Sequence, residues 1–401
     1  MGHLPFVILI LSIATISFGV KMETVYRWEY LDYVWNNPEH KEDAINSGNY
    51  NVNTCFLNDI DKADDGRIFA TVPKVFNFAV PASVVTVSDI IESGGPLLHP
   101  YPDWSWYNNS DTCDNIVNVH TIYIKCNHIF ILDIGYGPNN ESCDPKLLIF
   151  NLENDTLVKT INIPPDVANN ETGSGLLTTP FVYLPDKCKC NRLLDKMIVF
   201  ISDMIGSGLV VYDSSKNSLC RVESDFMRAT DSINITIANQ TVSFTGSIYG
   251  TTTIHDDLFY NPLTDKKVYK IKIKTLLKCP DKETANNQTK LVGELPTLTG
   301  PLASAKCSLF SSKYLQNSIQ GTNACKKFYP EDMVVFAQDD QKLQLVTGMK
   351  ALQHHNELIV SSSMTYITYP DGINLNMTNF FVLKFNLAEI QKKIDSKCKS
   401  D

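Results

Sequence analysis

The sequence predicts an all-β fold, a single disulfide-stapled domain that forms a six-bladed β-propeller. Short apolar strands followed by polar turns recur along the 401 residues, and helical periodicity is nearly absent. No Pro-, Ser- or Gly-rich linker divides the chain. Many short strands in one long domain are typical of radial repetition, because a propeller buries its sheets without one oversized core. Division of the chain by a plausible blade size gives about six blades.

The N-terminus predicts a cleaved secretory signal. Residues 1–19 contain no Lys, Arg, Asp or Glu, residues 4–16 are mostly apolar, and small residues precede Val20. We therefore expect a signal peptide over residues 1–19 and the propeller domain over residues 20–401. The apolar run is well below the ~20 residues that span a bilayer. We expect a secreted, extracellular protein without a membrane span.

The stretch 100–137 predicts a β-hairpin. Residues 122–125 and 129–132 are rich in β-forming side chains, and Cys126, Asn127 and His128 lie between them as a polar turn. The second run is apolar at consecutive positions, which is typical of a strand buried on both faces. Further strands are expected at 67–73, 146–152, 197–203, 208–213, 267–271, 333–336, 358–361 and 380–385, with one helix at 387–394.

The composition supports an oxidising compartment and argues against nucleic acid. The chain holds 11 cysteines and has a formal net charge of -9, whereas a nucleic-acid partner favours a basic face. An odd number of cysteines leaves at least one thiol outside intramolecular bridges. The sequence also contains eight N-glycosylation sequons, at Asn108, Asn140, Asn154, Asn170, Asn234, Asn239, Asn287 and Asn376.

A search for catalytic motifs is nearly empty. There is no Gly-x-Ser-x-Gly, His-Glu-x-x-His or Gly-x-x-x-x-Gly-Lys sequence, so we assign no catalytic residue, and we expect neither a cofactor nor a metal. Asp133, Asp203 and Asp257 each follow or interrupt an apolar strand. If these strands are the innermost of their blades, their carboxylates converge on the axial channel. The alternative is that they cap strand ends by accepting hydrogen bonds from backbone N–H groups.

The region that holds the hairpin also carries a family resemblance. The matching residues are Pro100, Tyr101, Pro102, Trp104, Trp106, Cys113, Cys126, Asn127, Leu132, Asp133 and Gly135. They resemble the signature of the yellow/major royal jelly protein family of insects, in which Pro-Tyr-Pro-x-Trp-x-Trp precedes a Cys-Asn turn and a strand that ends in Leu-Asp-x-Gly. The family's tryptophan after the Cys-Asn turn is absent from this sequence, where Ile129 and Phe130 stand.

The resemblance covers nearly the whole chain after the leader. Segments 26–33, 69–73, 80–83, 143–148, 208–213 and 258–263 resemble family elements in the same order. This implies a six-bladed β-propeller. It also implies that Cys126 pairs with Cys188 or Cys190, and that Cys325 pairs with Cys398. Two further expected bridges are Cys113–Cys143 and Cys279–Cys307.

The resemblance implies three alternative functions. Some salivary members of this family bind biogenic amines in the central channel, and this is our first expectation. We predict a ligand site at Asp133, Asp203 and Ser363, where Ser363 replaces a family asparagine. A secreted developmental, pigmentation or nutritional role without a tight ligand comes second. A melanin-pathway isomerase comes last, because no His–carboxylate pair is evident for proton transfer. Oligomeric state is left open.

Overall fold

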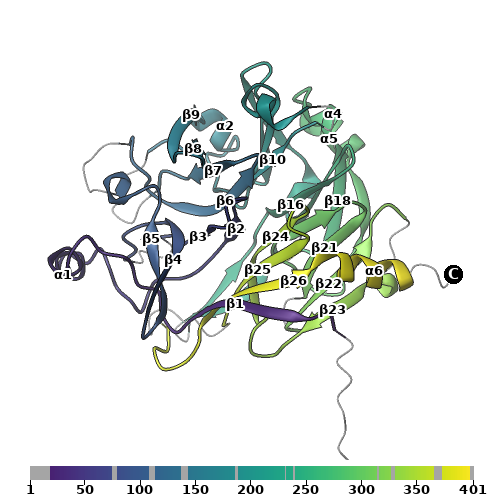
Figure 1. Cartoon of the computed structure of the whole chain (residues 1–401). Helices are drawn as coiled ribbons and strands as arrows, with labels where there is room; N and C mark the ends of the chain where they lie inside the picture. Colours follow the sequence, from purple (N-terminus) through teal and green to yellow (C-terminus); the bar gives the residue numbers. More distant parts are fainter. Residues whose placement is uncertain are drawn as a thin grey trace, which may run out of the picture.

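The structure is a computed structural model that describes residues 19–74, 79–107, 113–136, 143–185, 188–230, 232–237, 240–313, 316–326, 330–364 and 373–397. It confirms the six-bladed β-propeller. Six four-stranded antiparallel sheets follow one another around a centre, as Figure 1 shows by the order of colours along the chain. Residues 1–18 of the predicted signal peptide and Cys398 lie outside the described residues.

Within each sheet the strands follow one another from the channel outwards. The first three sheets are β2 (Ile60–Lys62), β3 (Ile68–Thr71), β4 (Val84–Glu92) and β5 (Gly95–Pro100); β6 (Val119–Lys125), β7 (His128–Asp133), β8 (Lys146–Asn151) and β9 (Thr156–Asn162); and β10 (Leu177–Tyr183), β11 (Ile198–Asp203), β12 (Gly208–Asp213) and β13 (Ser218–Glu223). The fourth and fifth are β16 (Ile248–Ile254), β17 (Asp257–Pro262), β18 (Lys267–Lys272) and β19 (Lys290–Glu294), then β20 (Leu302–Ala305), β21 (Ser308–Lys313), β22 (Ser318–Asn323) and β23 (Val334–Gln338). The sixth is β24 (Leu345–Leu352), β25 (Glu357–Ser363), β26 (Phe380–Asn386) and β1 (Met22–Trp28).

The remaining elements lie outside these sheets. A separate hairpin pairs β14 (Ile233–Ile237) with β15 (Gln240–Phe244). The α-helices are α1 (Pro38–Asn46), α2 (Pro165–Ala168), α3 (Leu193–Lys196), α4 (Ile273–Leu276), α5 (Lys282–Gln288) and α6 (Leu387–Lys397), the last of which includes the predicted helix. Within the described ranges, no helix has the length and apolar character needed to cross a membrane.

The ring is closed by pairing the two ends of the chain in one sheet. β1 pairs with β26 in antiparallel register, from Met22 opposite Phe385 to Trp28 opposite Phe380, and the two strands lie side by side in Figure 1. Trp28 is almost fully buried, and its indole N–H donates to the carbonyl of Pro96 at 2.7 Å. The sixth blade is therefore fastened to the first by side-chain as well as backbone contacts.

The second strand of a blade is buried on both faces, which explains its continuous apolar sequence. In β7, Ile129 and Ile131 pack in one core cluster with Phe69 of the first sheet. The alternate residues Phe130 and Leu132 pack in another cluster that includes β11 of the third sheet. Neighbouring blades thus share a core on each side of such a strand.

The predicted hairpin forms between β6 and β7. Cys126 and Asn127 both have positive φ, 51° and 56°, and Lys125 pairs with His128. Two central residues with positive φ make a type I′ turn, whose twist matches that of the flanking strands. The turn also places Cys126 beside the third blade, where it is bonded to Cys190.

Four disulfides are present in the described part of the chain, at Cys113–Cys143, Cys126–Cys190, Cys220–Cys279 and Cys307–Cys325. The Cys113–Cys143 bridge was expected, and Cys190 is one of the two partners expected for Cys126. The expected Cys325–Cys398 and Cys279–Cys307 bridges are wrong. The register of β21 and β22 pairs Ser308 with Asn323 and so brings Cys307 beside Cys325. Cys55 and Cys188 are free thiols.

This arrangement predicts the outcome of peptide mapping without reduction. A peptide pair that joins Cys307 to Cys325 is expected, since both flank one hairpin and their Cα atoms lie 5.3 Å apart. Cys188 is expected as an alkylated free thiol when the protein is unfolded in the presence of iodoacetamide. Recovery of a Cys325–Cys398 peptide pair would contradict this disulfide pattern.

Candidate functional site

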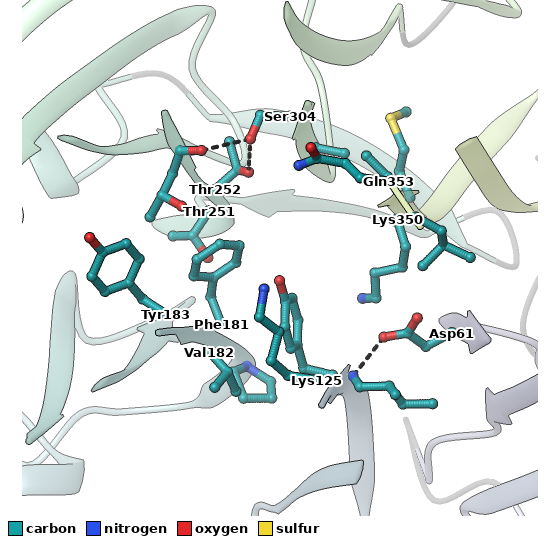
Figure 2. A pocket seen from close by; sticks show the side chains of 18 of the residues that line it. Asp61, Lys125, Phe181, Val182, Tyr183, Thr251, Thr252, Ser304, Lys350 and Gln353 are labelled. Atoms are coloured by element: carbon teal, nitrogen blue, oxygen red, sulfur yellow. Dashed lines mark hydrogen bonds between the residues drawn. The ribbon is translucent and has the colours of Figure 1, made fainter. Parts of the chain in front are cut away.

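The six inner strands surround an axial cavity. Its volume is about 620 Å³, and its lining includes residues of β2, β6, β10, β16, β20 and β24. Each inner strand contacts the next, and β24 contacts β2, so the ring is continuous. Because one face of each inner strand meets this cavity, these strands carry the polar side chains that the buried second strands lack. Figure 2 shows some of the side chains that line it.

Aromatic rings form one wall of the cavity. Tyr123 of β6 and Phe181 of β10 have ring centroids 5.1 Å apart at an interplanar angle of 61°. Tyr183 lies two residues further along β10 on the same face of the strand. Burial raises the pKa of the Tyr123 phenol well above its ordinary value, so Tyr123 stays neutral at physiological pH. This wall is suited to a flat apolar ring.

Two buried aspartates lie in β2 and immediately before it. Asp59 is 1% exposed and forms an ion pair with Lys350 of β24, with Nζ–O distances of 2.8 and 3.0 Å. It also accepts a hydrogen bond from the backbone N–H of Ile122 at 3.1 Å. The pair therefore ties the first blade to its neighbours in the ring, the second and sixth blades. Because its charge is matched by the lysine, Asp59 offers little to a ligand cation.

Asp61 differs from Asp59 because it has no cationic partner in an ion pair among the described residues. It is 1% exposed, and it accepts hydrogen bonds from the backbone N–H of Ile124 at 2.7 Å and of Lys62 at 2.8 Å. Burial raises the pKa of Asp61 to about 7, against the opposing effects of Lys350 and the Ile124 N–H group. Figure 2 shows its carboxylate at the edge of the cavity. A ligand ammonium placed there would stabilise the ionised form.

Hydroxyl groups line the side of the cavity formed by the fourth and fifth blades. Thr252 and Ser304 share a hydrogen bond at 2.7 Å, and Ser304 also donates to the carbonyl of Thr253 at 2.8 Å. Tyr249 extends from β16 to donate its phenol hydrogen to the carbonyl of Thr347 at 3.1 Å. These groups offer hydrogen bonds to polar substituents of a ligand ring.

The lining of the cavity includes three histidines, one of which lies near a disulfide, but no ready metal site is found there among the described residues. Nitrogen and sulfur atoms of His255, Cys307 and Cys325 lie within 4.8 Å of one another. The two sulfurs are bonded to each other, so neither is a thiolate ligand. His354 and His355 lie in the turn between β24 and β25, where His355 approaches Asp64 at 3.4 Å.

The three predicted ligand residues do not line this cavity. The premise that their strands are innermost is wrong, since β7, β11 and β25 are the second strands of their sheets. The carboxylate of Asp133 accepts hydrogen bonds from the N–H groups of Val117, Asn118 and Gly135 at 2.9–3.1 Å. Ser363 is buried, and its hydroxyl has no partner among the described residues.

Asp203 has the same structural role as Asp133. Its Oδ1 accepts hydrogen bonds from the N–H groups of Leu176, Ile205 and Gly206 at 2.7–3.1 Å. Its Oδ2 accepts one from Arg221 at 2.7 Å. These contacts match the alternative that such aspartates cap strand ends. Asp257 begins β17 and pairs with Lys270 and Lys272.

The missed residues of the first blade follow a period-2 pattern in the sequence, although β2 itself is only three residues long. In segment 59–62, Asp59 and Asp61 alternate with the buried Ile60, which is the period-2 pattern of a strand with one polar face. Segment 179–183 has no such polar alternation, because the partly buried residues Phe181 and Tyr183 alternate with the buried Val182. Alternation of polar and apolar residues is expected in an inner strand, whereas a continuous apolar run is expected in the second strand of a blade.

The raised pKa of Asp61 predicts a pH dependence of stability. Because this pKa rises from an ordinary value of 3.8 to about 7, the folded protein binds more protons at Asp61 than the unfolded chain does. The free energy of unfolding should therefore fall as pH rises from about 4 to 8. His120, whose pKa burial lowers to about 4, acts in the opposite direction below pH 6.5. The contribution of Asp61 is therefore isolated as a difference between variants.

The measurement is urea unfolding of the protein and of Asp61→Asn at several pH values. We expect the stability of Asp61→Asn relative to the unsubstituted protein to rise with pH by up to about 4 kcal/mol, the equivalent of three pKa units. The matched control is Asp64→Asn. The Asp64 side chain is 66% exposed, so this substitution should leave the pH dependence of stability unchanged. A difference that is flat between pH 4 and 8 would contradict the raised pKa.

Comparisons of the sequence with known proteins agree on one family. The sequence pattern of the family described as Major royal jelly protein matches residues 117–395. Major royal jelly protein 1 of Apis mellifera is 30% identical over 93% of this chain and 89% of its own length. Major royal jelly protein 8 of Apis mellifera is also 30% identical, over 92% of each chain. Among solved structures, a luciferin-regenerating enzyme is 9% identical, covers 90% of this chain and 95% of its own, and has a TM-score of 0.45.

Proposed function

Because the chain belongs to the major royal jelly protein family, we propose that it is a secreted glycoprotein whose axial channel binds a small aromatic amine. The observation that carries this proposal is Asp61, a buried carboxylate at the cavity edge without a cationic partner in an ion pair among the described residues. Asp61 would hold the ammonium, and the wall of Tyr123 and Phe181 would receive the ring.

The size and surroundings of the cavity support this class of ligand. A volume of about 620 Å³ falls within the range of about 300–1,000 Å³ that is typical of small-molecule sites. A charge held away from bulk water attracts an opposite charge more strongly than one on the surface. An aromatic face near the ammonium adds roughly 0.5–2 kcal/mol.

Calorimetric titration with serotonin, dopamine and histamine at pH 8 tests the proposal. We expect saturable heat with one site per chain for at least one amine. Replacement of Asp61 by Asn should weaken that binding at least tenfold, because a charge-assisted contact of about 1.5–3 kcal/mol is lost. The exposed Asp64→Asn variant is the matched control. Unchanged affinity in Asp61→Asn would refute the role given to Asp61.

The same titration should depend on pH. With a pKa of about 7, Asp61 is mostly ionised at pH 8 and mostly protonated at pH 6. The apparent affinity for an amine should therefore fall about tenfold over this interval, since only the ionised fraction is competent to bind. In the Asp61→Asn variant this pH dependence should disappear.

The predicted leader, the disulfides and the exposed sequons support secretion and glycosylation. Asn154, Asn287 and Asn376 lie on the surface, whereas Asn170 is half-buried and its amide donates to the carbonyl of Gly206. Asn108, Asn140 and Asn239 lie outside the described residues. The side chain of Asn234 is also not described. Treatment of the secreted protein with an endoglycosidase should lower its apparent mass.

The alternative is an isomerase of the melanin pathway, with which the raised pKa of Asp61 is compatible. A carboxyl group with a pKa near 7 is well matched to proton transfer at neutral pH. Turnover of dopachrome that disappears in Asp61→Asn would support this function. If neither heat with amines nor turnover is found, a secreted role without a tight ligand remains.

A further inference from the structure

The two ends of the axial cavity differ in their exposure to solvent. At one end, the lining is formed by exposed residues of the turns that follow the inner strands, among them Asp64, His255 and Lys306. At the other end, where the inner strands begin, the lining stops at buried residues such as Asp59 and Thr347. We call the first end the mouth of the cavity and the second end its floor.

Tyr249 extends across this floor. It belongs to β16 of the fourth blade, and its hydroxyl donates to the carbonyl of Thr347 in the sixth blade at 3.1 Å. Burial and the nearby charge of Asp59 raise the pKa of this phenol, and a hydrogen bond with the Asn58 side chain opposes the rise. Asn58 and Asp59 belong to the first blade, which lies opposite the fourth in a ring of six. The neutral Tyr249 side chain therefore reaches from one side of the channel toward the other.

Hydrogen bonds between the first two blades give the depth of the two aspartates in the cavity. The backbone N–H of Ile122 donates to Asp59 at 3.1 Å, and that of Ile124 donates to Asp61 at 2.7 Å. Both strands thus advance by two residues toward the mouth between these bonds. Because a strand rises by about 3.3 Å per residue, Asp61 lies about 7 Å nearer the mouth than Asp59 does.

The aromatic wall lies on the floor side of Asp61. Tyr123 precedes Ile124, whose N–H group donates to Asp61, and the centroid of its ring is 5.1 Å from that of Phe181. Figure 2 shows Asp61 and Phe181 at the same cavity. A ligand whose ammonium lies at Asp61 and whose ring lies against this wall therefore directs its ring toward Tyr249.

We propose that Tyr249 closes the floor of the channel and makes it selective for arylalkylamines with one compact ring system. This inference rests on the proposed function and names its ligand class more closely. A group that extends the ligand ring away from the ammonium meets the Tyr249 side chain, which is held in place by its hydrogen bond to Thr347. Overfilling a packed site costs free energy, and such a clash is a general means of rejecting a larger ligand.

The test compares two ligand pairs by calorimetry at pH 8, namely serotonin with 5-benzyloxytryptamine and tyramine with 4-benzyloxyphenethylamine. The members of a pair differ only in a benzyl group on the ring oxygen. In the unsubstituted protein, each benzyl ether should bind about tenfold or more weakly than its parent amine, as overpacking predicts. In Tyr249→Ala, the benzyl ether should bind at least as tightly as the parent, because the obstructing side chain is absent. Tyr249→Phe is the matched control, since it keeps the ring and should still reject the benzyl ethers.

The outcomes distinguish this inference from the proposed function. If the parent amines and the benzyl ethers bind equally well to the unsubstituted protein, the inference fails and the proposed function stands. If Tyr249→Ala still rejects the benzyl ethers, another part of the cavity sets the length of the ligand, and the inference also fails. If no amine of either pair binds, the proposed function fails, and the ligand selectivity inferred from it fails too.

A crystal structure of Tyr249→Ala tests the closure of the floor without any ligand. We expect a channel that is open from the mouth through the floor, and a floor that stays closed in this variant would contradict the role of Tyr249. Circular dichroism and the melting temperature show whether the variant is folded. If Tyr249→Ala does not fold, Tyr249→Leu takes its place in both experiments, because leucine retains apolar volume but is too short to reach Thr347.

Discussion

Replacement of Lys350 by Met should destabilise the protein by about 3–5 kcal/mol at pH 8, the usual cost of leaving one member of a buried ion pair alone. Asp59 is 1% exposed, and Lys350 is its ion-pair partner at 2.8 Å. The remaining carboxylate would either stay ionised without a counter-charge or take up a proton. Burial already raises the pKa of Asp59, so the loss should be smaller at pH 5 than at pH 8.

Urea unfolding followed by circular dichroism measures this effect, and two variants control it. The double variant Asp59→Asn, Lys350→Met should recover most of the lost stability, because it removes the buried charge. Lys384→Met removes a surface pair with Glu23, whose side chains are 30% and 53% exposed, and should cost less than about 1 kcal/mol. Equal losses in Lys350→Met and Lys384→Met would contradict the importance of the buried pair.

Replacement of Asp203 by Asn should also destabilise the fold by about 3–5 kcal/mol, without a direct effect on the channel. Asn retains one oxygen for the N–H groups of Leu176, Ile205 and Gly206, but it turns an amide N–H toward the Arg221 guanidinium, which donates to Oδ2 at 2.7 Å. Two donors then face each other in a site that is fully buried. Arg221 loses one of its two carboxylate partners and keeps Glu223, whose Oε1 lies 2.6 Å from its Nε.

The measurement pairs thermal unfolding with amine titration at a temperature where the variant remains folded. Stability should fall while affinity stays unchanged, which is the opposite of what Asp61→Asn should do. The control is Asp225→Asn, at an exposed pair with Lys282, where little change is expected. A loss of affinity for the amine in folded Asp203→Asn would contradict this prediction and indicate that Asp203 contributes to ligand binding.

The fold could be predicted from the sequence because the second strand of a blade has a distinctive, continuously apolar sequence. The runs 129–132 and 198–201 are apolar at every position, since cores of two neighbouring blades cover both of their faces. The same feature misled the prediction of the site. We took the most apolar strands for the innermost ones, although an inner strand has one face on the channel and therefore carries polar residues such as Asp61 and Thr252.

The contacts that define the site join residues too far apart for sequence reasoning. Asp59 and Lys350 are separated by 291 positions, and only the closed ring brings β2 beside β24. A three-residue strand such as β2 also gives too short an alternation to be recognised alone. The disulfide error has a similar origin, because the Cys307–Cys325 pairing depends on the register of one hairpin.

The most direct test of ligand binding in the axial channel is a crystal structure of the protein with 5-bromotryptamine, in which bromine gives an anomalous signal. We predict one bromine peak inside the cavity near Phe181, with the ammonium of the ligand at the carboxylate of Asp61. A peak only on the outer surface of the propeller, or an empty cavity at a saturating concentration of the ligand, would contradict the account.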